Sequence, residues 1–111
     1  MENVANGVQA WNLGPGTRHA LVTTAIGERY LSNFTQYSLP YWKIYAETFD
    51  LAIIVISDET AFDGRDGGLN GAWLKLLAPL LVAKVKPQIE RVALIDSDVI
   101  VNPAAPNIFA A

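Results

Sequence analysis

The chain has no cysteine and only one histidine, His19, in its 111 residues. The absence of cysteine excludes a disulfide framework, a zinc site built from thiolates and a cysteine nucleophile, and it is compatible with a reducing compartment. His19 precedes an apolar run and lies far along the chain from the aspartates near residue 97, so we interpret it as structural. No Ser-His-Asp hydrolase pattern is recognisable.

Long apolar runs and basic clusters are also missing. No stretch approaches the roughly 20 apolar residues of a membrane span, and residues 1–16 lack the basic start and apolar core of a signal peptide. We therefore expect no membrane span and a cytoplasmic protein. The net charge is −3 and the lysines and arginines are scattered, so no basic surface for the phosphate backbone of a nucleic acid is apparent. A P-loop and a dinucleotide-binding glycine fingerprint are absent as well.

The composition is that of a globular domain, with 51% hydrophobic and 17% charged residues. The length allows one domain. Residues 1–18 end in Gly14, Pro15 and Gly16 and show no clear period, so we predict a flexible lead-in there and a single α/β domain over residues 19–111.

Three apolar runs predict strands, at residues 20–24, 51–57 and 91–95. The second run, LAIIVIS, is uninterrupted, as expected of a parallel strand buried on both faces. Two helices are predicted between the strands, at residues 32–50 and 70–86, with kinks or breaks at Pro40 and Pro79.

The spacing of large apolar residues predicts the buried face of each helix. In the first helix this face contains Phe34, Tyr37, Tyr41, Ile44, Tyr45 and Phe49, and in the second Trp73, Leu76, Leu77, Leu80 and Val85. The alternation of strands and helices predicts a layered, mostly parallel, Rossmann-like sheet with right-handed crossovers. Ligands of such sheets gather at the carboxyl ends of the strands, where TTAIGERY, SDE and DSD are expected to lie.

The sequence IDSDV places Asp96 and Asp98 directly after the third apolar run. If the chain stays extended there, both carboxylates point to the same face, because side chains alternate along a strand. Two carboxylates about 5 Å apart repel by roughly 3 kcal/mol at an effective dielectric near 20. A divalent cation, a shared proton or open water would relieve that repulsion.

A wider pattern surrounds these aspartates. Trp73 and Lys75 lie in the preceding predicted helix, the strand and motif read RVALIDSDVIV, and NPAAPNIF follows with Asn107, Ile108 and Phe109. This succession, over about residues 20–109, resembles the metal-binding segment of GT-A fold glycosyltransferases, and most closely the glycogenin-like and related galactosyltransferase groups.

The resemblance implies a nucleotide-diphosphate sugar donor, an acceptor of unknown identity, and Mn²⁺ or Mg²⁺. Asp98 would then bind the metal directly, and Asp96 would share that role or hold sugar hydroxyls. Lys75 would pair with phosphate or sugar as the catalytic cation. The donor-binding set implied in this way is Thr23, Thr24, Ala25, Tyr30, Asp58, Lys75, Asp96 and Ser97.

Two alternatives stay open on the sequence. A phosphatase of the haloacid dehalogenase type also uses Asp-x-Asp after a strand, but needs further groups downstream that the 13 residues after Asp98 do not supply. A non-enzymatic α/β module that binds a nucleotide or a protein is the other alternative. We also expect the donor-binding half alone to be catalytically incomplete, and to self-associate through an open sheet edge beside the third strand.

Overall fold

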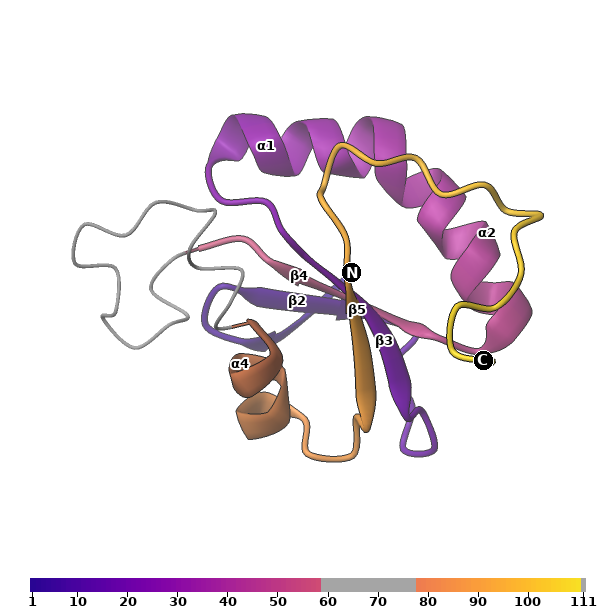
Figure 1. Ribbon diagram of the computed structural model, residues 1–111. Helices are drawn as coiled ribbons and strands as arrows, with labels where there is room; N and C mark the ends of the chain where they lie inside the picture. The colour runs from indigo at the N-terminus through magenta and orange to yellow at the C-terminus, as the bar shows by residue number, and fades with distance from the viewer. Residues whose placement is uncertain (59–77, 111) are drawn as a thin grey trace.

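In the computed structural model, which describes residues 1–58 and 78–110, five strands form one mixed sheet with helices on both faces (Figure 1). The strand order is β1-β2-β4-β3-β5. The strands are β1 (Glu2–Ala5), β2 (Val8–Trp11), β3 (His19–Thr24), β4 (Ala52–Ile56) and β5 (Arg91–Leu94). The fold is therefore a small α/β domain, as the alternation of elements predicts.

Three adjacent strands of the sheet, β4, β3 and β5, are parallel, and they are the three predicted strands. β3 pairs in parallel with β4 on one side and with β5 on the other. Every residue of β4 is buried, which confirms that its uninterrupted apolar run is covered on both faces. The core lies in two layers, one on each face of the sheet, and residues of β3 and β4 contribute to both layers.

The amino-terminal residues correct the predicted lead-in. β1 and β2 form a hairpin, and β2 pairs antiparallel with β4, so the sheet is mixed rather than mostly parallel. Val8 and Ala10 point into the core, while Gln9 and Trp11 are half-buried. Two strands of four residues are too short to show a clear period, and Gly7, with φ 74°, supplies the tight turn between them.

A continuous helical layer covers one face of the sheet. It contains α1 (Glu28–Asn33), a π-helical turn η1 (Phe34–Ser38) and α2 (Leu39–Phe49). The predicted interruption near Pro40 is confirmed, since the wide turn directly precedes α2 and Pro40 lies in its first turn. Proline has no N–H, so it cannot donate the main-chain hydrogen bond of a regular helix, and the wide turn lies where that bond is missing.

The buried face of this layer differs from the predicted one. Phe34 and Tyr45 are buried as expected, but Tyr37, Tyr41 and Ile44 are 57%, 45% and 51% exposed. The turn η1 holds more residues than an α-helical turn, so it rotates the residues that follow it relative to an uninterrupted helix. Trp42 becomes the most central residue of the layer instead, with none of its surface exposed.

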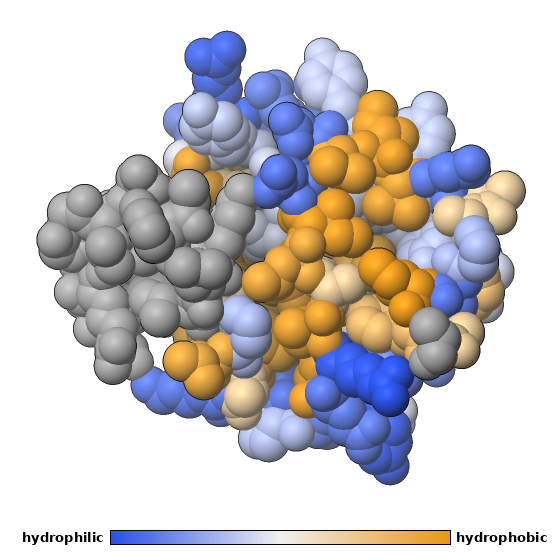
Figure 2. Space-filling model, in the orientation of Figure 1, coloured by the Kyte–Doolittle hydropathy of each residue, from blue (hydrophilic) through white to orange (hydrophobic). Residues whose placement is uncertain are grey.

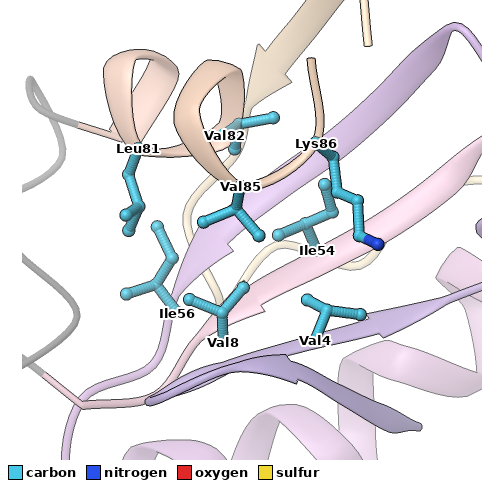
Figure 3. Close-up of a pocket in the computed structure, with 8 residues that line it drawn as sticks. All are labelled: Val4, Val8, Ile54, Ile56, Leu81, Val82, Val85 and Lys86. Atoms are coloured by element: carbon cyan, nitrogen blue, oxygen red, sulfur yellow. The ribbon is translucent and has the colours of Figure 1, made fainter. Parts of the chain in front are cut away.

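The opposite face is covered by α4 (Ala78–Val85). Its side chains Leu81, Val82 and Val85 lie over four residues of the sheet and leave a gap of about 10 Å³, room for at most one water (Figure 3). Those four residues are Val4, Val8, Ile54 and Ile56. The prediction that Leu80 is buried is wrong: it is 69% exposed, because Ala78 and Val82, four residues apart, make up the buried side. Trp73, Leu76 and Leu77 lie outside the described residues.

Candidate functional site

The strand order reverses beside β3. The chain passes from β3 through α1 and α2 to β4 on one side, and later through α4 to β5 on the other side (Figure 1). The described helices of the two connections, α1 and α2 in the first and α4 in the second, lie on opposite faces of the sheet (Figure 1). In α/β sheets ligands bind at the carboxyl ends of the strands beside such a reversal.

A hollow of about 50 Å³ opens at this position. It is lined by Val22, Thr23 and Thr24 from β3 and by Leu94, Ile95 and Asp96 from the end of β5. Three residues of the predicted donor-binding set, Thr23, Thr24 and Asp96, are therefore brought together, although 69 residues lie between the two segments in the sequence.

Thr23 contributes an unusual group to this hollow. The residue is 2% exposed, and its Oγ1 has no hydrogen-bond partner in the described part of the chain. A buried hydroxyl without a partner costs about 1–3 kcal/mol of stability, and most buried polar groups in proteins do have partners. Thr23 therefore brings to the lining of the hollow a hydroxyl that makes no hydrogen bond within the described residues.

The aspartates lie on a turn and not on a strand, which corrects the same-face arrangement expected for them. β5 ends at Leu94, and the N–H of Val99 donates to the carbonyl of Asp96 at 3.1 Å. Asp96 and Asp98 are both exposed, and Ser97 between them is half-buried. Open water thus reaches both carboxylates.

Two side chains of the helical layer hold this turn. The hydroxyl of Ser38 donates to the carbonyl of Ser97 at 2.9 Å, and the indole N–H of Trp42 donates to the carbonyl of Val99 at 2.8 Å. Sequence reasoning missed both residues. A spacing of four places them on one helix face, and polar hydrogens on an apolar face are the signal that could have shown them.

Tyr45 continues the same row of donors. Its hydroxyl donates to the carbonyl of Pro106 at 2.8 Å and accepts from the N–H of Ile108 at 2.9 Å. Residues 97–108 therefore run along the helical layer, as the yellow trace over α1 and α2 shows (Figure 1). Phe109 then returns to the sheet and stacks on His19, with ring centroids 4.8 Å apart, which agrees with a structural role for the histidine.

Other described residues of the predicted set do not line the hollow. Ala25 is buried beneath the helical layer, and its N–H donates to the carbonyl of Ile56. Tyr30 is 62% exposed on α1. Asp58 is exposed just beyond β4, at the same edge of the sheet but on the other side of β3. Lys75 lies outside the described residues.

The carboxylates suit a metal ion that brings other ligands with it. In residues 1–58 and 78–110 no group of three or more His, Cys, Asp or Glu side chains could hold a metal ion. Asp96 and Asp98 nevertheless supply two hard oxygen donors on one turn. Mg²⁺ is commonly held by one or two carboxylates together with substrate phosphates and water, and this donor set fits that mode.

Comparisons with known proteins add no relative. A scan against models of protein families, a search of curated proteins and a search of solved structures each found no match to this chain. Among the helices that the structure describes, none has the length and apolar character needed to cross a membrane.

Proposed function

We propose that this chain is a metal-dependent glycosyltransferase, or its donor-binding half, with a Rossmann-like sheet that binds a nucleotide-diphosphate sugar. The observation that carries the proposal is the hollow at the reversal of strand order, which is lined both by Thr23, whose hydroxyl has no partner in the described residues, and by Asp96. Polar residues at the carboxyl ends of parallel strands favour a nucleotide-type ligand.

The size of the hollow limits what it holds. About 50 Å³ is far below the roughly 300–1,000 Å³ of a whole small-molecule site. One polar group of the ligand, such as a ribose hydroxyl or a base edge, fits beside Thr23 and Thr24. The rest of the nucleotide then lies over the exposed turn at Asp96 to Asp98.

Asp96 and Asp98 would hold Mn²⁺ or Mg²⁺ against the diphosphate. When bound, the ion neutralises the charge that develops on the departing diphosphate. Ser97 contributes its main chain to the turn, and its carbonyl accepts a hydrogen bond from the hydroxyl of Ser38. The two hydrogen bonds from the helical layer fix the backbone of the turn before a ligand arrives, which lowers the cost of ordering it.

Titration calorimetry tests the proposal. Uridine diphosphate and the other nucleoside diphosphates are titrated with Mn²⁺ and again with a chelator. We expect the Asp98→Asn variant to lose about tenfold or more in affinity, because one charged ligand of the ion is gone. Asp50→Asn is the matched control: Asp50 is an exposed aspartate at the end of α2 with φ 54°, a conformation that asparagine also adopts.

Equal binding with and without chelator, or in wild type and Asp98→Asn, would contradict the proposal. A second assay separates an enzyme from a binding module. Release of free sugar and nucleoside diphosphate from a bound nucleotide sugar supports a transferase site, whereas metal-dependent binding without any turnover is expected both of the donor-binding half alone and of the non-enzymatic alternative.

A further inference from the structure

The outer edge of β5 is open. β5 is the last strand of the sheet, and in the described part of the chain only β3 pairs with it. The N–H groups of Arg91 and Ile95 point to β3, where they donate to the carbonyls of Arg18 and Val22. Because these groups alternate in direction along a strand, the N–H and C=O groups of Val92 and Leu94 point outward.

A groove accompanies this edge. It is shallow and open, with a volume of about 560 Å³, and is lined by β5, Ile95, Ile108 and Phe109. The exposed large apolar residues of this part of the chain are Leu94, Val99, Ile100 and Ile108. Figure 2 shows a continuous apolar area on the face where β5 lies in Figure 1. An open edge inside an apolar groove has the features of a site for an added strand.

The charges at the two ends of β5 select the occupant and its direction. At the start of the strand Arg18 and Glu90 form an ion pair, so their charges cancel. Arg91 then gives this end of the strand a net positive charge. Asp96 and Asp98 follow the end of the strand. A second copy of β5 in antiparallel orientation brings the acidic end of each strand to the basic end of the other, whereas a parallel copy brings like charges together.

We propose that two copies of this chain associate through antiparallel pairing of β5 with β5, around a two-fold axis at Ala93. This register pairs Val92 of each copy with Leu94 of the other, so all the outward N–H and C=O groups of the strand form hydrogen bonds. The two sheets become one continuous sheet, and the open β5 edge of each copy is removed.

Sedimentation equilibrium of the whole chain across a range of concentrations tests the proposal. We expect a reversible dimer. Leu94→Lys should raise the dissociation constant by about tenfold or more, because it places two cations inside the paired edge. The matched control is Leu80→Lys, which changes an exposed leucine on α4, away from the edge, and should leave the constant unchanged. Circular dichroism checks that both variants are folded.

A cysteine variant tests the register, since the chain has no cysteine of its own. The two Ala93 residues would face each other in a non-hydrogen-bonded pair, with Cα atoms about 4.5 Å apart, within the usual range of about 4.4–6.8 Å for a disulfide. We expect Ala93→Cys to form a disulfide-linked dimer in air much faster than Leu80→Cys. A monomer at every concentration, a dimer that Leu94→Lys leaves intact, or equal cross-linking of the two cysteine variants would each overturn the proposal.

Discussion

The indole N–H of Trp42 donates to the main-chain carbonyl of Val99 at 2.8 Å, and this bond joins the first half of α2 to the end of the Asp96–Val99 turn. Trp42 is fully buried and meets Phe34 edge to face, with ring centroids 4.9 Å apart. One side chain thus belongs both to the core and to the candidate site. The stability of the fold and the geometry of the turn are therefore coupled.

Replacing Trp42 with Phe tests this coupling. The change keeps an aromatic ring but removes the hydrogen bond and part of the buried volume, so we expect a loss of about 2–3 kcal/mol of unfolding free energy. Urea denaturation measures that loss. The N–H of Val99, which closes the turn, should also exchange faster with solvent. Trp11→Phe, at a half-buried tryptophan of β2, serves as the control and should leave the exchange of Val99 unchanged.

Tyr45→Phe tests how residues 106–108 are held on α2. The variant removes the hydroxyl that bonds both Pro106 and Ile108, and we expect a cost of about 1–2 kcal/mol, with faster exchange at the N–H of Ile108. Tyr41→Phe is the matched control, because Tyr41 is 45% exposed on the same helix. If the two variants unfold at the same urea concentration, the hydrogen bonds of Tyr45 contribute nothing measurable.

Lys75 stays a prediction from the sequence alone. If its predicted helix begins beside the ligand, its charge reaches the diphosphate, and Lys75→Ala should weaken diphosphate binding by about tenfold with nearly unchanged stability. Lys84→Ala and Lys86→Ala, at the far end of that predicted helix, should leave diphosphate binding unchanged. Calorimetry and thermal melting of the three variants measure both quantities. Equal affinities would remove Lys75 from the site.

The central strands were predictable because their residues carry the signal themselves. The run from Leu51 to Ile56 is apolar throughout, because a strand that is buried on both faces needs an apolar side chain at every position. The turn at Asp96 was not predictable in this way. β5 ends just before this turn. The side chains of Ser38 and Trp42 donate hydrogen bonds to the carbonyls of Ser97 and Val99, which lie 59 and 57 residues further along the chain. Contacts so distant in sequence leave no local period.

The exposed face of α2 has a different cause. The spacing of Tyr37, Tyr41 and Ile44 fits a regular helix. Tyr37, however, lies within the π-helical turn, and this turn changes the direction of Tyr41 and Ile44, which follow it in α2. A single inserted residue per turn is enough to exchange a buried face for an exposed one. Sequence periodicity therefore identified the helix and placed three of its side chains on the wrong side.

Thr23→Val separates the requirements of the ligand from those of the fold. Valine has nearly the same shape and lacks the hydroxyl that finds no partner in the described residues, so we expect a gain of up to about 1 kcal/mol in unfolding free energy. Affinity for a metal–nucleotide complex should fall by about tenfold, because the ligand loses that hydrogen bond. Thr23→Ser should retain most of the affinity.

Thr17→Val is the matched control for this experiment. Thr17 is also buried, at 5% exposed, but its Oγ1 accepts from the N–H of Gly14 at 3.1 Å and donates to the carbonyl of Asn12 at 3.4 Å. Removing it should destabilise the chain by about 1–2 kcal/mol and leave nucleotide affinity unchanged. Opposite signs of the two stability changes show that the Thr23 hydroxyl is unused by the fold. If Thr23→Val instead destabilises the chain as much as Thr17→Val, the hydroxyl serves the fold and the hollow loses its principal polar group.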